Sequence, residues 1–287
     1  MIDLSKIENE WVHNNSYFSF QEKEKFINYF FDGLDIEKIN GSIFGIQHTE
    51  FENEDMKKIN VLVCVENCNF WNHYAHYNKY GPYGNKNIKI YIYNHIARMT
   101  LSADYIGIPT IYPQMRYFKR MFEHIKPTLS PAEQRKKFCL IATRITDNRK
   151  KMIVDKLQSM GLCDFLNDYK EILANKSCYH SQELLDVFSR YKYVFVAENS
   201  IQEGYVTEKI FNCFFARTIP IYNGAPDITR YFNKDSFIHI RNLQDLQSLV
   251  TNDGQTPSLD VHSIINQCFD DENYIEKVNC FIEKILT

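Results

Sequence analysis

The chain has 287 residues, of which 44% are hydrophobic and 24% charged, and its formal net charge is −3. This length is long for one domain and comfortable for two, and the composition is that of an ordinary globular protein. The near-neutral charge excludes broad electrostatic binding to a polyanion such as nucleic acid. Any anion site must therefore come from a few placed Lys or Arg residues.

The first half of the chain mixes helical and strand patterns. Helical spacing of apolar residues covers residues 18–36. Four short strands are expected, at 42–47, 59–65, 88–96 and 105–113, the last interrupted by prolines. Residues 66–85 are polar, aromatic and rich in turn formers, and a loop of that length in a compact domain is usually functional.

In the second half of the chain, predicted strands and helices alternate more regularly. The apolar rhythm stops over residues 122–137, which we interpret as a domain boundary. Strands are then expected at 138–143, 192–199 and 218–223. Helices are expected at 147–161, 181–191, 207–217 and 261–287. This alternation of strands and helices is typical of a parallel sheet covered by helices.

Together the two halves predict an α/β protein with two domains facing across a cleft. We expect an N-terminal domain over 1–125, a second domain over 136–262, and a C-terminal helix over 263–287 that crosses back to the first domain.

The cysteines and the N-terminus favour a cytoplasmic protein. The eight cysteines include no Cys-x-x-Cys pair and complete no zinc pattern, so we expect reduced thiols. The first residues lack the basic-then-apolar pattern of a secretion signal. No stretch approaches the roughly 18 apolar residues that span a bilayer, so no membrane segment is expected. The oligomeric state stays open.

The run VFVAENSIQEGYVTEKI, residues 194–210, carries the strongest chemical signal. Glu198 and Asn199 follow an apolar strand, and ligands of parallel α/β domains sit outside the carboxyl ends of strands. Thr207 suits the N-cap of the next helix, where its hydroxyl would accept a hydrogen bond from a backbone N–H group of the first turn.

The first turn of that helix combines an acid and a base. Lys209 opposes the helix dipole there, which makes better sense if a phosphate lies against it. Glu208 is suited to accept hydrogen bonds from sugar hydroxyls. The alternative is an ordinary capped helix whose Glu and Lys side chains are solvated.

Residues 195–240 resemble the donor-binding motif of the α1,3/4-fucosyltransferases, glycosyltransferase family 10. The shared pattern is Glu-Asn, then Tyr-Val-Thr-Glu-Lys, a helix, Ile-Pro-Ile-Tyr, Gly-Ala-Pro and Ser-Phe-Ile, in the family order. In this chain these elements begin at Glu198, Tyr205, Ile219, Gly224 and Ser236. The resemblance implies a GT-B fold, with two Rossmann-like domains and the nucleotide sugar held mainly by the second.

Two weaker matches extend the resemblance. Residues 138–157 are similar to a family segment whose Arg contacts the donor pyrophosphate; Arg149 fits best and Arg144 is the rival, although Ala142-Thr143 departs from the Ser/Asn-rich family loop. A solvated Arg is the alternative. Residues 61–69 resemble a strand ending in Gly-Glu-Asn, in which the Glu is the catalytic base.

That match implies that Glu66 is the base, although Val65 replaces the family glycine. Partial desolvation at the end of a strand would raise the pKa of this carboxyl toward a useful range. The alternative is a Glu that points into water.

The resemblance implies an inverting enzyme that moves L-fucose from GDP-β-L-fucose to a hydroxyl of a glycan acceptor, α1,3 to GlcNAc or similar. It implies donor contacts from Arg149, Glu198, Asn199, Tyr205, Thr207, Glu208 and Lys209. Aromatic faces in the long loop suit an acceptor sugar, and the candidates are Trp71, Tyr74 and His76. With no Asp-x-Asp motif, we expect no metal site and no tightly bound cofactor, and a divalent cation that only modulates the rate.

Two other interpretations stay open. The same fold could use another nucleotide-linked sugar, since the phosphate contacts would be shared. The Val65 departure also fits a non-catalytic relative that binds a nucleotide sugar or glycan without turnover.

Overall fold

The computed structural model describes residues 43–45, 60–64, 88–93, 99–128, 137–143, 145–161, 163–165, 181–246, 260–266 and 272–286. By its contacts the chain divides into two compact units. The first comprises Met1–Tyr117, Glu203–Tyr205 and Asp270–Thr287, and the second comprises Phe118–Gln202 and Val206–Phe269. The predicted ranges 1–125, 136–262 and 263–287 stay predictions.

The first unit contains a five-stranded sheet in the order β1-β2-β3-β5-β4. Its strands are β1 (Ile43–Gly45), β2 (Asn60–Cys64), β3 (Ile88–Tyr93), β4 (Thr100–Leu101) and β5 (Ile106–Pro109). Neighbouring strands are parallel except β4, which pairs antiparallel with β5. Ile90, Tyr91 and Ile92 of β3 are buried, as are Ile106 and Ile108 of β5, as expected for a sheet covered on both faces.

Helix α4 (Ile111–Met121) corrects the strand expected over 105–113. Only Ile106–Pro109 is extended, and the helix begins two residues later. Pro113 stands in the first helical turn, where a missing N–H group costs nothing, so it starts the helix instead of breaking a strand.

The second unit contains a five-stranded parallel sheet in the order β10-β9-β8-β6-β7. Its strands are β6 (Lys137–Ile141), β7 (Cys163–Phe165), β8 (Tyr191–Ala197), β9 (Ile219–Asn223) and β10 (Ile238–His239). In chain order this is the doubly wound 2-1-3-4-5 arrangement. The strands predicted at 138–143, 192–199 and 218–223 are confirmed as β6, β8 and β9.

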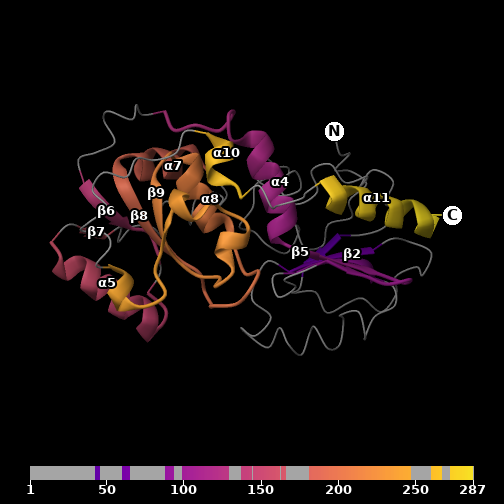
Figure 1. The fold of residues 1–287 in the computed structure, drawn as a ribbon, viewed down its shortest axis with the longest axis horizontal. Helices are drawn as coiled ribbons and strands as arrows, with labels where there is room; N and C mark the ends of the chain where they lie inside the picture. Colours follow the sequence, from indigo (N-terminus) through magenta and orange to yellow (C-terminus); the bar gives the residue numbers. More distant parts are fainter. Residues whose placement is uncertain are drawn as a thin grey trace. The chain divides into compact units, whose positions relative to one another are not determined.

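Helices cover both faces of this sheet (Figure 1). They are α5 (Asn148–Ser159), α7 (Gln182–Ser189) and α8 (Glu208–Phe215). Ile153, Val154 and Leu157 of α5 pack on one face, in a core that includes Phe195 and Ile221. Successive strand residues point to opposite faces, so the intervening residues face α7 and α8. Because both faces are buried, β8 is apolar along most of its length.

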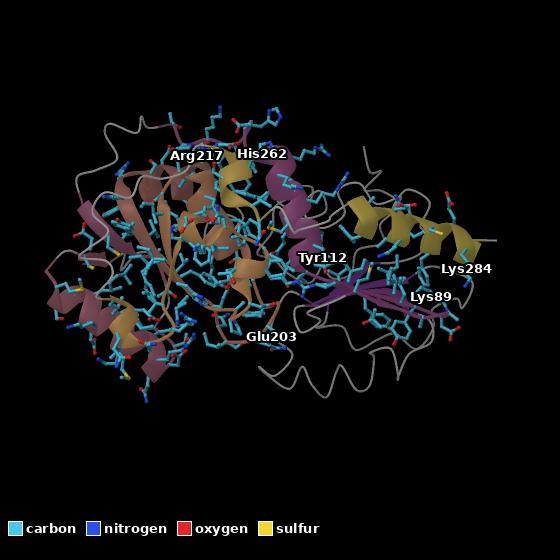
Figure 2. The ribbon with its side chains drawn as sticks, viewed as in Figure 1. Lys89, Tyr112, Glu203, Arg217, His262 and Lys284 are labelled. Carbon is cyan, nitrogen blue, oxygen red and sulfur yellow. The ribbon has the colours of Figure 1, made fainter. Side chains whose placement is uncertain are left out.

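Arg217 closes the end of helix α8 in an uncommon backbone conformation, with φ of 58° (Figure 2). Its guanidinium donates hydrogen bonds to the Phe214 and Phe215 carbonyls at 3.1 and 3.3 Å and to the Phe122 carbonyl at 2.5 Å. It also lies 3.5 Å from the centre of the Phe122 ring. These contacts add side-chain hydrogen bonds to carbonyls at the end of α8, where intrahelical partners run out, and tie that end to Phe122.

The remaining described elements are short, apart from one helix. They are the 3-10 helices η4 (Ile228–Arg230), η5 (Lys234–Ser236) and η6 (Leu243–Leu246), and the helices α10 (Val261–Ile264) and α11 (Glu272–Leu286). The single helix predicted over 261–287 is therefore wrong in part, because Ile265 at the end of α10 is extended. In the first unit, Tyr274 of α11 packs edge-on against Tyr112. Within the described ranges, no helix combines the length and apolarity needed to cross a membrane.

Candidate functional site

The site lies where the chain order of the parallel sheet reverses. From β6 the chain continues to β7 on one side, and β8 lies on the other side. The loops that follow β6 and β8 therefore diverge, and this is where ligands bind in open α/β sheets. The Thr143 hydroxyl joins the two loops by donating a 3.4 Å hydrogen bond to the Ala197 carbonyl.

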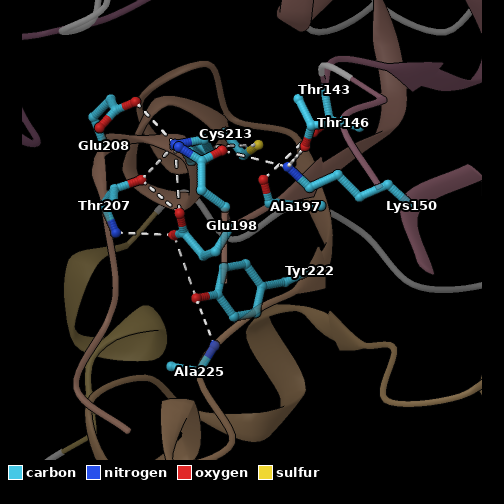
Figure 3. Close-up of polar contacts among 12 residues, drawn as sticks. Thr143, Thr146, Lys150, Ala197, Glu198, Thr207, Glu208, Cys213, Tyr222 and Ala225 are labelled. Carbon is cyan, nitrogen blue, oxygen red and sulfur yellow. Dashed lines mark hydrogen bonds and ion pairs between the residues drawn. The ribbon is translucent and has the colours of Figure 1, made fainter. Parts of the chain in front are cut away.

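Glu198 directly follows β8, and its carboxylate is fully buried with partners on both oxygens (Figure 3). Oε1 accepts hydrogen bonds from the Thr207 backbone nitrogen at 2.9 Å and from the Tyr222 hydroxyl at 3.4 Å. Oε2 accepts one from the Thr207 hydroxyl at 2.8 Å and lies 3.4 Å from Lys209 Nζ. Burial raises the pKa of this carboxyl, and the Lys209 charge opposes the rise.

Thr207 occupies the N-cap position of α8, but its predicted hydrogen bond is wrong. Its hydroxyl makes no capping bond to the first turn. The hydroxyl instead donates to the buried Glu198 carboxylate, whose charge strengthens the hydrogen bond. The same hydroxyl oxygen accepts a 2.9 Å hydrogen bond from Lys209 Nζ.

Lys209 joins two acids across the start of α8. Its ammonium lies 3.4 Å from Glu198 Oε2 and 3.4 Å from Glu208 Oε1. The Lys209 and Glu208 side chains are only 19% and 18% exposed, so water shields the charges of this pair only in part. A dianion approaching here would compete with Glu208 for Lys209.

Arg149 holds the ends of two strands together. One guanidinium nitrogen donates to Asn223 Oδ1 at 2.7 Å, and the other donates to the Glu198 carbonyl at 2.9 Å. The second nitrogen also lies 3.4 Å from Asp147 Oδ2. Arg149 thus links the start of α5 to the carboxyl ends of β8 and β9.

Lys150 is a site residue that the motif comparison missed. It is 1% exposed, and its Nζ donates to Thr146 Oγ1 at 3.3 Å and to Asn199 Oδ1 at 3.4 Å. Burial lowers the pKa of this amine to about 8, and the Lys209 charge is the second cause. The helical spacing could have revealed Lys150, since it shares the buried face of α5 with Ile153, Val154 and Leu157.

Tyr222 and Gly224 shape the wall beneath Glu198. The Tyr222 hydroxyl donates to Glu198 Oε1 and accepts a 3.1 Å hydrogen bond from the Ala225 nitrogen. A methyl group at Gly224 would collide with the Tyr222 hydroxyl and lie 2.6 Å from Glu198 Cγ. Only glycine fits at this position without moving these buried side chains.

The other predicted site residues fall into two groups. Asn199 is half-buried beside Lys150, and Tyr205 is fully buried in the segment Glu203–Tyr205. The rest lie outside the described residues: Glu66, Trp71, Tyr74, His76 and the alternative Arg144. Their roles stay predictions.

The described part of the site thus brings three cations, Arg149, Lys150 and Lys209, to the carboxyl edge of one sheet. Such an arrangement can hold a diphosphate and stabilise negative charge that develops on it. Within the described residues, no group of three or more His, Cys, Asp or Glu side chains is placed to hold a metal ion.

A protein-family model matches the part of the chain that forms this site. Residues 131–252 match the C-terminal part of glycosyltransferase family 10 (fucosyltransferase). Over this range the chain is similar to the fucosyltransferases of family 10. All the described cations and acids of the site lie within the matched range, so the predicted resemblance is confirmed.

Two curated relatives support this family 10 assignment. An α-(1,3)-fucosyltransferase FucT of Helicobacter pylori is 35% identical over 72 residues, which are 25% of this chain and 15% of that protein. A GDP-fucose protein O-fucosyltransferase 3 of Gallus gallus is 25% identical over 171 residues, which are 54% of this chain and 36% of that protein. The chain therefore spans only a minor part of these relatives.

Solved structures extend the likeness beyond the family 10 domain. A crystal structure of an α1,3-fucosyltransferase aligns with a TM-score of 0.59 at 17% identity, covering 94% of this chain and 88% of that one. Another, of an α1,3-fucosyltransferase with GDP-fucose, aligns with a TM-score of 0.54 at 17% identity, covering 95% and 88%. These matches confirm the predicted α/β fold of the GT-B type.

Proposed function

We propose that the chain is a fucosyltransferase that moves L-fucose from GDP-β-L-fucose to a hydroxyl group of a glycan acceptor, with inversion at the sugar carbon. One observation carries this proposal: residues 131–252 match the family 10 model, and that range places a cluster of cations at the switch point of its sheet. The relatives named as fucosyltransferases and the structure solved with GDP-fucose support the choice of donor.

The chemistry needs help at two points. The GDP leaving group gains negative charge as the bond to the sugar breaks, and fixed cations at the sheet edge stabilise that charge without reorganising. The attacking hydroxyl must lose a proton, a role we assign to Glu66 in the first unit. No tightly bound cofactor is required by this scheme, and a divalent cation would only modulate the rate.

The acceptor has two candidates. An α1,3 linkage to GlcNAc or a similar sugar follows from the resemblance to the α1,3/4-fucosyltransferases. A hydroxyl on a protein is the second candidate, because the Gallus gallus protein O-fucosyltransferase relative matches 54% of this chain, more than the 25% that the Helicobacter pylori enzyme matches.

A transfer assay tests the proposal. GDP-fucose is offered with a β-galactosyl-N-acetylglucosamine acceptor and, separately, with a folded Ser/Thr-containing protein acceptor, and product is measured by mass spectrometry. Transfer to either acceptor supports fucosyl transfer and selects between the candidates. Thermal shifts with GDP-fucose, GDP-mannose, UDP-galactose and GDP test the donor, and stabilisation by UDP-galactose without any by GDP would contradict it.

Loss of turnover tests the base. Glu66→Gln should abolish transfer while GDP-fucose affinity is kept, because the amide cannot accept the proton. Donor binding without transfer by the wild-type protein, and no change in Glu66→Gln, would instead favour a non-catalytic relative.

A further inference from the structure

Lys150 and Arg149 stand side by side at the start of α5, but their surroundings differ. The Arg149 guanidinium already has three oxygen partners within the protein, on Asn223, Glu198 and Asp147. These contacts use three of the five N–H donors of the guanidinium and order the strand ends.

Among the described residues, the Lys150 ammonium has only neutral hydrogen-bond partners. Its hydrogen bonds, to Thr146 Oγ1 and Asn199 Oδ1, are long at 3.3 and 3.4 Å, and no carboxylate of the described residues forms an ion pair with it. A cation taken out of water without a counter-charge is costly. The cost here is increased by Lys209, whose charge repels the same ammonium.

We propose that Lys150, together with Lys209, binds the diphosphate of the sugar donor. The proposal rests on the proposed function for the identity of the donor, but its chemistry requires only a diphosphate. Thr146 is exposed and Asn199 half-buried, so the ammonium lies one hydrogen bond below the surface. Phosphate oxygens reach it by replacing the two long hydrogen bonds.

The charges around Lys150 make this binding depend on pH. Lys209 on α8 and Arg149 on α5 lower the pKa of the amine, while Asp147 before α5 and Glu198 after β8 raise it. Burial is the largest cause, and the amine of the free protein loses its proton near pH 8. A diphosphate favours the charged amine, so its affinity is highest below pH 8 and falls about tenfold per pH unit above it.

GDP itself contributes little to this dependence above pH 7, because the last proton of its terminal phosphate is lost near pH 6, at roughly the pKa of a phosphate monoester. An Arg at position 150 stays charged over the whole range. Lys150→Arg should therefore bind a diphosphate at pH 7 and lose the fall in affinity above pH 8.

The experiment measures binding to the full chain by calorimetry, of inorganic pyrophosphate at pH 7 and of GDP from pH 7 to about 9. Lys150→Met should weaken both ligands by about 10- to 100-fold at pH 7, the loss of one charge-assisted hydrogen bond. Lys150→Arg should bind with a flat pH profile. The matched control is Lys151→Met, on the exposed side of the same turn, where Lys151 pairs with Asp155; it should bind as wild type.

Thermal unfolding without ligand separates binding from folding. Because the buried charge is unfavourable in the free protein, Lys150→Met should melt at or above the wild-type temperature. Wild-type affinity in Lys150→Met, an equal loss in Lys151→Met, or a GDP affinity without a fall above pH 8 would each overturn the proposal. If pyrophosphate binding depends on Lys150 but no fucose is transferred, the proposed function is contradicted while the diphosphate site at Lys150 is supported.

Discussion

Helices α5 and α8 both begin at the carboxyl edge of the second sheet, but they begin differently. At α5, Asp147 Oδ1 accepts a 2.9 Å hydrogen bond from the Lys150 backbone nitrogen, an ordinary N-cap. At α8, the Thr207 hydroxyl turns away from the helix and donates to Glu198, nine residues earlier. The start of α5 is capped by the residue directly before the helix, whereas the start of α8 is bound by Glu198, which follows strand β8.

This difference explains why Lys209 is held so firmly. Glu198 belongs to the loop after β8, and through Thr207 and Lys209 it ties the start of α8 to the sheet. An electrostatic site works best when its charges are fixed before the ligand arrives. Helix α8 therefore lacks an ordinary side-chain cap, but its Lys209 ammonium is held next to the sheet by Glu198.

The largest loss of stability should come from adding a methyl group at Gly224, beneath Glu198. Gly224→Ala drives a methyl group into the Tyr222 hydroxyl and to 2.6 Å from Glu198 Cγ. Both side chains are buried, so we expect a loss of about 3 kcal/mol in the free energy of unfolding, measured by denaturant titration. Gly161→Ala is the comparison, since Gly161 has φ of +69° and no atom within 4 Å; it should cost about 1 kcal/mol. Equal losses would contradict the steric argument.

Removing the charge of Glu198 should weaken the α8 start next. In Glu198→Gln one amide end must face either the Thr207 nitrogen or the Thr207 and Lys209 donors, so a buried donor loses its acceptor. We expect a loss of about 2–3 kcal/mol and weaker GDP binding. The control Glu203→Gln, at an exposed position, should change stability by less than about 0.5 kcal/mol. An undisturbed Glu198→Gln variant would show that the carboxylate does not hold α8.

The Thr207 hydroxyl can be tested alone. Thr207→Val keeps the shape and removes both the donor to Glu198 and the acceptor for Lys209. Stability should fall by about 1–2 kcal/mol, and GDP affinity should fall with it. Thr207→Ser keeps the hydroxyl and should restore most of both. If the valine and serine variants behaved alike, the hydroxyl would have no part in positioning Lys209.

The smallest loss of stability should come from removing Asp147, the N-cap of α5. Asp147→Ala should cost about 1 kcal/mol, and Asp147→Asn much less, because an amide oxygen also caps a helix. Burial acts to raise the pKa of Asp147, but the Lys150 backbone hydrogen bond and Arg149 outweigh it and lower that pKa. Thermal melts compare the variants; a larger loss in Asp147→Asn than in Asp147→Ala would contradict a capping role.

Much of the second unit could be predicted from its sequence. The apolar runs of β6, β8 and β9 are typical of buried parallel strands, and the helices between them follow from spacing and caps. Strands β7 and β10 were not predicted, because they have three and two residues and lie at the sheet edges. Helix α4 was missed because Pro113 indicates a break unless its place in the first turn is known.

The site was less predictable than the fold. The positions of Glu198, Asn199, Glu208 and Lys209 at one edge follow from the strand–loop–helix pattern. The partner of the Thr207 hydroxyl does not, since it is the buried Glu198 carboxylate, nine residues earlier, and not a backbone N–H group of the first turn. Arg149 and Lys150 are adjacent in sequence, and their different surroundings depend on contacts to Asn223 and Asn199 in other loops.

A crystal structure of the chain with GDP would test the central claim most directly. We predict the diphosphate at the carboxyl edge of the second sheet, with phosphate oxygens within hydrogen-bond distance of the ammonium groups of Lys150 and Lys209. A nucleotide bound elsewhere, or a diphosphate that contacts neither lysine, would contradict the account.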